Sequence, residues 1–167
     1  MTFFSTLLRR LCSSAGSWCL LWGYNRKAMT NDWNTRNLKV IEEFRANAGK
    51  VAGRYARMPV LLLTTRGAKT SRSHTTPLAY SRDGERLVVI ASKGGSPTNP
   101  DWYHNLVANP QVIVEVGREK FEAKASVLTG EERDRAFAQQ AAQMPFFADY
   151  EKRTPRKIPA IALERTG

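Results

Sequence analysis

The stretch RGAKTSRSH (66–74) carries residue types that can bind a phosphate group, directly after the apolar run VLLLTT. Its basic side chains are Arg66, Lys69, Arg72 and His74. It is not a P-loop, because the first glycine is missing, Ala68 splits the Gly-Lys pair, and no helix is expected to follow. A turn with exposed backbone N–H groups, a lysine and hydroxyls can nevertheless hold a phosphate without a helix. Taken alone, a solvated basic hairpin is the simpler interpretation.

Two later stretches have residues that suit a flat ligand. Ser92-Lys93-Gly94-Gly95 follows an apolar run, and paired glycines allow the backbone to approach a ligand closely. The stretch NPDWYHNL (99–106) opens a helix with two large aromatic residues, Trp102 and Tyr103. The alternatives are a flexible loop for the first stretch and core packing for at least one of the aromatics. No catalytic triad or metal site competes, because the chain has only 2 histidines and neither has a clear partner.

The periodicity of apolar residues predicts about six strands around these stretches. The expected strands are 60–65, 74–80, 86–92, 111–116, 120–128 and 158–163. Most of them are joined by hairpins, with turns expected at 81–84 and at Gly117-Arg118. Because strands and helices do not alternate, a mainly β fold, an antiparallel barrel with peripheral helices, fits better than a doubly wound parallel sheet.

Three helices are expected beside this barrel. The first covers 35–48. The second begins at Pro100, with Asn99 as its cap. The third reaches Met144 and begins with a capping box formed by Thr129 and Glu132.

The chain is strongly basic, and this narrows its partners. Its 26 Lys and Arg residues against 15 Asp and Glu give a formal net charge of +11, and residues 45–82 contain no acidic side chain. Such a zone attracts nucleic acid, an anionic membrane or a phosphorylated small ligand. Nucleic acid is the least favoured, because the basic residues gather in turns and the strands are aliphatic.

The first 29 residues form a basic and apolar leader before a domain expected over 30–167. Arg9-Arg10 interrupts its apolar residues, so no run reaches the length of a membrane span. One interpretation is a helix on an anionic membrane surface. The other is a leader that is disordered or untranslated, with the biological start at Met29.

Cysteine usage adds a prediction about the compartment. Cys12 and Cys19 are the only two cysteines, and their spacing suggests neither a disulfide framework nor a metal site. A reduced, cytoplasmic setting is therefore expected, with the inner face of the plasma membrane as the place where the leader would attach.

Taken together and in order, these stretches resemble one protein family. PVLLLTTRGAKTSRSHTTPLAY, VVIASKGGSPTNPDWYHNL and ANPQV are similar to the deazaflavin-dependent nitroreductase and quinone reductase family of actinobacteria, and RKIPAIAL near the C-terminus is similar too. The resemblance covers roughly residues 51–163. It implies a split β-barrel related to flavin-binding barrels and the reduced 8-hydroxy-5-deazaflavin coenzyme F-420. It also implies hydride transfer to a quinone or nitroaromatic acceptor.

The resemblance further implies roles for single residues. Lys69 and Thr70 match a phosphate-contacting pair, which Arg66, Arg72 and His74 would assist. Positions around the deazaflavin are matched by Lys93, Gly94, Gly95, Trp102 and Asn105. At the reacting face, Ser92 and Tyr150 match positions where a side chain could hydrogen-bond the acceptor, and Tyr150 or water could supply a proton.

This chain departs from the family pattern at three positions. Ala68 and His74 stand where arginines are common, so phosphate contact would be shared with Arg66 and Arg72. Phe147 stands where members that reduce nitro drugs have a tyrosine, which favours a quinone acceptor. The alternative to an enzyme is a protein that binds a deazaflavin, flavin or haem without turnover.

Overall fold

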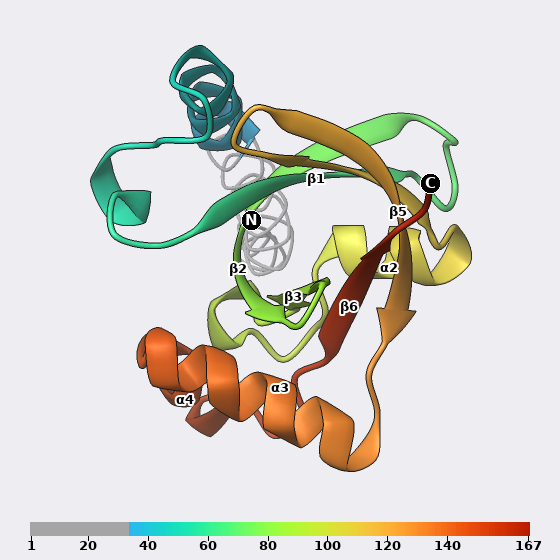
Figure 1. The fold of residues 1–167 in the computed structure, drawn as a ribbon. Coiled ribbons are helices and arrows are strands. Elements are labelled where there is room, and N and C mark those ends of the chain that lie inside the picture. The colour runs from blue at the N-terminus through green and yellow to red at the C-terminus, as the bar shows by residue number, and fades with distance from the viewer. Residues whose placement is uncertain (1–33) are drawn as a thin grey trace, which may run out of the picture. The chain divides into compact units, whose positions relative to one another are not determined.

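Six antiparallel strands form a closed barrel in the order β1-β2-β3-β6-β5-β4 (Figure 1). The structure is a computed structural model that describes residues 34–167, and its contacts divide the chain into two units, Met1–Leu38 and Lys39–Gly167. The strands are β1 Val60–Arg66, β2 Ser73–Asp83, β3 Arg86–Ile90, β4 Gln111–Val116, β5 Glu119–Val127 and β6 Ala160–Arg165. The predicted barrel class is therefore confirmed.

Helices lie outside the barrel or between its strands. A helix covers 34–46, and the further elements are η1 Gly53–Tyr55, η2 Lys93–Gly95, α2 Asp101–Ala108, α3 Gly130–Gln143 and α4 Phe146–Lys152. In Figure 1, α3 and α4 lie on one side of the barrel, next to β3 and β6.

The apolar strands are buried on both faces, which explains why several read as continuous hydrophobic runs. In β1, Leu61 and Leu63 point into the barrel, while Leu62 packs with Ile41 and Phe44 of the first helix. In β3, Val89 points inward and Val88 packs with the group that includes residues of α3 and α4. Successive strand residues face opposite sides of a sheet, so a strand covered by a helix needs apolar residues at every position.

Two polar side chains of α3 are buried and form hydrogen bonds with other parts of the chain. Gln140, with 0% of its surface exposed, accepts a hydrogen bond from Ser81 and donates one to the carbonyl of Ala79. Arg133 donates to the carbonyl of Ile158 at 2.8 Å and pairs with Glu151 of α4 at 2.5 Å. These bonds connect α3 to β2, to α4 and to the segment before β6, which positions α4.

The predicted strand ends differ from the observed ones by up to three residues, most of all in β2, β3 and β6. β2 continues to Asp83, which pairs with Arg86, so the turn consists of Gly84 and Glu85 and not of residues 81–84. β3 ends at Ile90, two residues before the expected end. β6 begins at Ala160 and not at Ile158, because Ile158 packs into the group of residues beneath α3.

The predicted cap residue of α2 is wrong, and the predicted cap residue of α3 is in place but forms no capping box. Pro100, and not Asn99, occupies the N-cap position of α2, and it makes no side-chain cap. Thr129 occupies the N-cap position of α3 without a side-chain hydrogen bond, and Glu132 instead pairs with Arg86 at 2.8 Å. In both cases a residue from elsewhere in the chain binds the side chain that was expected to cap the helix. Arg86 binds Glu132, and an arginine described below binds Asn99.

Candidate functional site

The hairpin between β1 and β2 presents the basic residues predicted to hold a phosphate. Its turn is closed by hydrogen bonds from the Gly67 amide to the Arg72 carbonyl at 2.8 Å and from the Ser71 amide to the Gly67 carbonyl at 2.9 Å. Arg66, Lys69 and Arg72 are exposed, and no carboxylate in the described part of the chain forms an ion pair with them. Their positive charges are therefore available to an anionic ligand.

Thr70 and His74 fold back over the start of this turn. A Cβ added to Gly67 would lie 2.7 Å from Thr70 Oγ1 and 3.3 Å from His74 Nε2. The Thr70 hydroxyl also accepts a hydrogen bond from the Arg72 amide at 3.4 Å. A side chain at Gly67 would crowd both the hydroxyl and the imidazole, so glycine leaves room for these two polar groups at the turn that carries Lys69.

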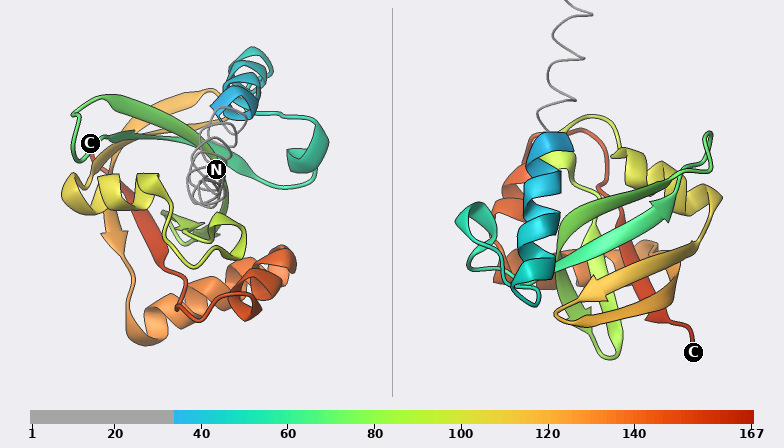
Figure 2. Two further views of the ribbon diagram at one scale, coloured as in Figure 1. Left: turned by 180° about the vertical axis from the view of Figure 1, so that it is seen from behind. Right: turned by 90° about the horizontal axis from the view of Figure 1, so that it is seen from above.

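Helix α2 fixes the hairpin through two asparagines. Asn105 accepts a hydrogen bond from the Ala68 amide at 3.1 Å and donates one to Thr65 Oγ1 at 3.3 Å. Asn109 donates to the Arg66 carbonyl at 3.3 Å. Figure 2 shows the hairpin projecting beside α2 in the right-hand view. Asn105, predicted to flank the deazaflavin, therefore uses both polar atoms of its side chain to hold the hairpin.

The segment 91–99 leads directly from β3 to α2 and has an unusual backbone. Lys93, Gly94 and Gly95 have φ values of 47°, 65° and 82°, so three consecutive residues are left-handed. A Cβ at Gly95 would lie 3.0 Å from the Tyr150 carbonyl oxygen, whereas a Cβ at Gly94 would meet nothing within 4 Å. Gly95 is therefore packed against α4, and Gly94 is the glycine that leaves an open approach to the backbone.

Arg156 holds this segment from the side of the C-terminal tail. Its guanidinium donates to the carbonyls of Ser96 at 2.9 Å, Ala91 at 3.0 Å and Ser92 at 3.1 Å, and to Asn99 Oδ1 at 2.6 Å. Burial lowers the pKa of Arg156. RKIPAIAL contributes to the family resemblance, but the sequence predicts no role for this arginine; its position between Pro155 and Pro159 is the one signal available there.

The other predicted residues lie near the segment 91–99 or in the core. Ser92 has 8% of its surface exposed. Tyr150 is half-buried on α4, in edge-to-face contact with Phe146 and Phe147. Lys93 donates from Nζ to Thr98 Oγ1 at 3.2 Å, which fixes it to its own loop. Trp102, predicted to flank the coenzyme, has 7% of its surface exposed and packs in the barrel core, so most of it is unavailable to a ligand.

These contacts place both predicted halves of the site beside one helix. The segment 91–99 ends where α2 begins, and Asn105 in the second half of α2 binds the hairpin. An eight-residue helix is about 12 Å long. The basic hairpin and the glycine-containing segment are thus held at a separation set by α2, which suits a ligand with an anionic end and a flat end.

The comparisons with known proteins identify the family. The model of the F420H(2)-dependent quinone reductase family matches residues 36–165. The chain belongs to this family. An F420H(2)-dependent quinone reductase of Mycobacterium tuberculosis (strain ATCC 25618 / H37Rv) is 40% identical over 126 residues, which make up 73% of this chain and 85% of that protein.

Solved structures agree with the family in fold. That of an F420-H2 dependent reductase, FDR-A, is 36% identical with a TM-score of 0.60, covering 64% of this chain and 94% of that chain. A domain-swapped dimer is 34% identical with a TM-score of 0.62, covering 81% of this chain and 99% of the other. The resemblance, the oxidoreductase class and F-420 as the family coenzyme are therefore confirmed.

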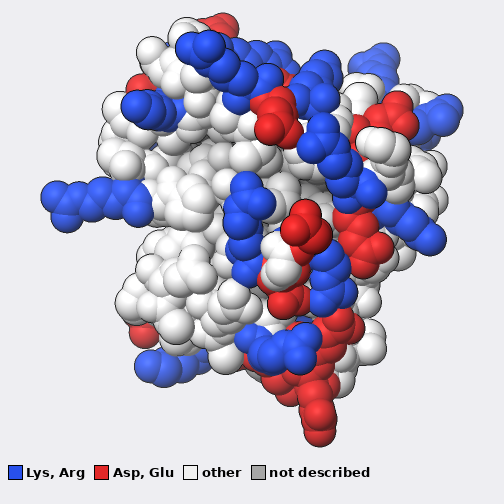
Figure 3. All heavy atoms as spheres, in the orientation of Figure 1, with Lys and Arg blue, Asp and Glu red and all other residues white. Residues whose placement is uncertain are grey.

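The residues of this quinone reductase family member fit an anionic coenzyme in their chemistry. The exposed cationic side chains of the hairpin and the backbone N–H groups of its turn can donate hydrogen bonds to a phosphodiester and to carboxylates. The open backbone at Gly94 suits a flat ring. On the face shown in Figure 3, basic side chains spread over much of the surface, with acidic side chains among them and a further acidic cluster at the lower edge. The individual roles of these residues remain predictions.

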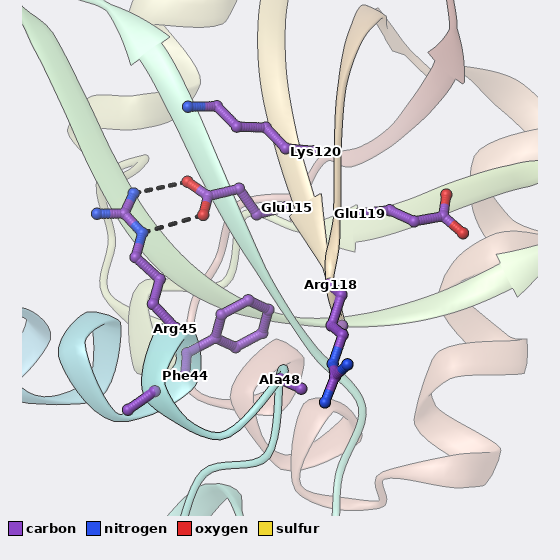
Figure 4. A pocket seen from close by; sticks show the side chains of 9 residues that line it. Phe44, Arg45, Ala48, Glu115, Arg118, Glu119 and Lys120 are labelled. Carbon is purple, nitrogen blue, oxygen red and sulfur yellow. Dashed lines mark hydrogen bonds and ion pairs between the residues drawn. The ribbon is translucent and has the colours of Figure 1, made fainter.

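A second region, away from the predicted site, is a hollow of about 390 Å³ beside the turn between β4 and β5 (Figure 4). It is lined by Phe44, Arg45, Ala46, Ala48, Glu115, Gly117, Arg118, Glu119 and Lys120. Arg45 donates two hydrogen bonds to Glu115, at 3.0 and 2.6 Å, and these bonds lower the pKa of the Glu115 carboxyl. The negative charge of the buried Glu115 carboxylate in this hollow is therefore already neutralised by Arg45.

Metal-binding clusters and membrane-spanning helices are both absent from residues 34–167. Within residues 34–167, no group of three or more His, Cys, Asp or Glu side chains could hold a metal ion. No helix in the same part of the chain is long and apolar enough to cross a membrane. The leader with its two cysteines lies outside the described residues.

Proposed function

We propose that this chain reduces a quinone to a hydroquinone with a hydride from reduced coenzyme F-420. The coenzyme supplies the hydride, that is, two electrons and one proton, and is left oxidised. A second proton, from Tyr150 or water, completes the hydroquinone. The protein's own task is to hold the coenzyme and the acceptor together and to limit the access of water.

The observation that supports this proposal is the way α2 joins two loops that are far apart in the sequence. Asn105 binds Ala68 in the hairpin, 37 positions away. The same helix follows the segment that contains Ser92, Lys93 and Gly94. A coenzyme with an anionic tail and a flat ring is the ligand class that uses both loops at once.

The hairpin would bind the anionic part of the coenzyme. Arg66, Lys69 and Arg72 are exposed and unpaired within the described residues, so they can contact phosphate or carboxylate without first breaking an ion pair. Thr70 and His74 lie over the same turn, where they can add hydrogen bonds.

The acceptor would lie beside α4. The Tyr150 carbonyl lies against Gly95, so α4 and the segment 91–99 are in direct contact. Tyr150, which is half-buried, is the main hydroxyl side chain proposed to hydrogen-bond the quinone oxygen as negative charge develops on it, and Ser92 would contribute only through the 8% of its surface that is exposed. Phe147 carries no hydroxyl where family members that reduce nitro drugs have a tyrosine, which favours a quinone over a nitroaromatic acceptor.

The test is an assay with purified protein and a panel of acceptors. We expect binding of F-420 at micromolar concentration, much weaker binding of FMN, and oxidation of the reduced coenzyme when menadione is added. Nitroaromatic compounds should react more slowly than the quinone. Binding of F-420 without any oxidation on addition of quinones would instead support a non-catalytic binder, and equal or stronger binding of FMN would refute the coenzyme assignment.

The leader gives a further proposal about location. We propose that the first 29 residues attach a cytoplasmic protein to the inner face of the plasma membrane, because this segment has 4 basic residues, no acidic ones and several aromatics. Deleting residues 1–28 should leave activity in solution unchanged and lower binding to vesicles that contain anionic lipid. Equal vesicle binding by both proteins would contradict this location.

A further inference from the structure

Arg156 connects the two ends of the segment 91–99. It binds the carbonyls of Ala91 and Ser92 at the start of the segment, and the Ser96 carbonyl and Asn99 side chain near its end. These partners lie 57 to 65 positions earlier in the sequence. Thr154, two residues before Arg156, adds a hydrogen bond from its hydroxyl to the Ser96 carbonyl at 3.4 Å. The tail before β6 therefore acts as a clamp on this segment.

The residues between these ends adopt a conformation that needs such a clamp. Lys93 has a φ of 47°, although it is not a glycine, and it is followed by two left-handed glycines. A non-glycine residue is unfavourable in this region and persists only where the surroundings hold it. Gly95 is fixed by its packing against Tyr150 and Arg153, whereas Gly94 faces open space. The segment thus has fixed ends and one accessible residue in its middle.

The acceptors of Arg156 differ from those of the other buried arginine. Arg133 has 7% of its side chain exposed and pairs with carboxylates, Asp134 at 3.0 Å and Glu151 at 2.5 Å. The hydrogen bonds from Arg156 go to three backbone carbonyl groups and one side-chain amide oxygen, all neutral. Across residues 34–167, no carboxylate forms an ion pair with Arg156. A partly buried cation that is bound only by loop backbone and one loop side chain orients that loop and does not neutralise an acidic residue.

We propose that Arg156 is a positioning residue for the coenzyme, which holds the segment 91–99 so that the open backbone at Gly94 faces the ligand. This inference rests on the proposed function, since the ligand is F-420. Lysine has a single ammonium group and cannot bind four separated acceptors in the geometry of the planar guanidinium. Glutamine has fewer donors still and no charge.

The experiment compares Arg156→Lys and Arg156→Gln with the wild-type chain. The first measurement is the dissociation constant of oxidised F-420, followed by its fluorescence with no acceptor present. The second is hydrogen–deuterium exchange of the amides in residues 92–96, without coenzyme. We expect the dissociation constant to rise about tenfold for Arg156→Lys and more for Arg156→Gln, with faster exchange in both variants.

Arg45→Lys is the matched control, because it alters an arginine that binds Glu115 in the hollow by the β4–β5 turn and does not contact this segment. It should lower the melting temperature while the dissociation constant stays within twofold and exchange in 92–96 stays unchanged. A milder variant, Asn99→Ala, removes only one acceptor of Arg156 and should raise the dissociation constant about threefold. It decides the question if the Arg156 variants do not fold.

The outcomes separate the inference from the proposed function. If the wild type binds F-420 but Arg156→Lys, Arg156→Gln and Asn99→Ala all bind it within twofold of the wild type, the positioning role is refuted. The same holds if exchange in 92–96 is unchanged in these variants. If the wild type does not bind F-420 at all, the proposed function is refuted instead.

Discussion

The two loops predicted to hold the coenzyme are stabilised in different ways. The hairpin between β1 and β2 has exposed cations and a turn closed mainly by its own backbone hydrogen bonds. The segment 91–99 is left-handed at three residues, packs against α4 and is held by Arg156. The comparison indicates that the first loop acts mainly through its charge and the second mainly through the shape of its backbone. Substitutions in the first loop should therefore change electrostatic attraction to the coenzyme, and substitutions in the second should change the backbone conformation.

The largest expected effect tests the shape of the second loop. Gly95→Ala should lower the free energy of unfolding by about 2–4 kcal/mol, because a Cβ there meets the Tyr150 carbonyl and the φ of 82° is unfavourable for alanine. Gly94→Ala has a similar φ but open space, so it should cost only about 1 kcal/mol. Urea unfolding measures both values. Similar losses in the two variants would show that packing against α4 does not matter.

The next effect tests the charge of the first loop. Lys69→Ala should raise the dissociation constant of F-420 about fivefold at low salt, and the difference from wild type should shrink as salt is added. Because Lys69 is exposed, the free energy of unfolding should change by less than about 0.5 kcal/mol. Lys124→Ala, an exposed lysine on β5, is the control with no effect on binding. An unchanged dissociation constant for Lys69→Ala would remove this lysine from the site.

A smaller effect is expected where α2 connects the two loops. Asn105→Ala removes the partners of the Ala68 amide and Thr65 hydroxyl, so it should lower the free energy of unfolding by about 1 kcal/mol. The dissociation constant of F-420 should rise about twofold to threefold, because the hairpin becomes less ordered. Asn109→Ala, which removes one bond to the Arg66 carbonyl, should do less. If Asn105→Ala changes stability but not binding, the hairpin does not need α2 for coenzyme contact.

The smallest effect lies in the hollow by the β4–β5 turn and should leave both loops unchanged. The hydrogen bonds from Arg45 hold the pKa of Glu115 below its usual value of 4.5, so the ionised carboxylate stabilises the fold. This contribution is present above about pH 4.5 and is lost as the pH falls through the lowered pKa of the folded state. Because Arg45 is half exposed, we expect it to be at most about 1 kcal/mol.

Glu115→Gln tests this pH dependence. The variant should be less stable than wild type at pH 7, and the difference in unfolding free energy should become smaller at pH 3. The affinity for F-420 at pH 7 should be the same in both proteins. A change in affinity would connect the hollow to the coenzyme site and would break the separation between the two regions.

The wrong predictions share one cause. Local patterns favour Asn99 and Glu132 as helix caps, but these residues bind Arg156 and Arg86 instead. Helix α4, a seven-residue helix directly after Pro145, is not among the helices that the sequence predicts. Local patterns cannot reveal these outcomes, since the competing partners are distant in the sequence or depend on packing.

The sequence by itself determined the barrel and the chemistry of its loops. Alternating apolar residues specify strands, continuous apolar runs specify strands covered on both faces, and the acid-free region 45–82 specifies an anionic partner. The ordered motifs also identified the family and its coenzyme, which the family model confirmed. These properties are local or additive along the chain, and for that reason they can be read without a structure.

Only the tertiary structure decided how the loops are held. Arg156 binds Ala91 across 65 positions, and Asn105 binds Ala68 across 37. Whether a polar side chain caps its own helix or binds a distant loop depends on which partner the folded chain brings within about 3 Å. RGAKTSRSH could therefore be predicted to bind the anionic part of a ligand, but the bonds from Arg156 to the segment 91–99 could be found only in the folded barrel.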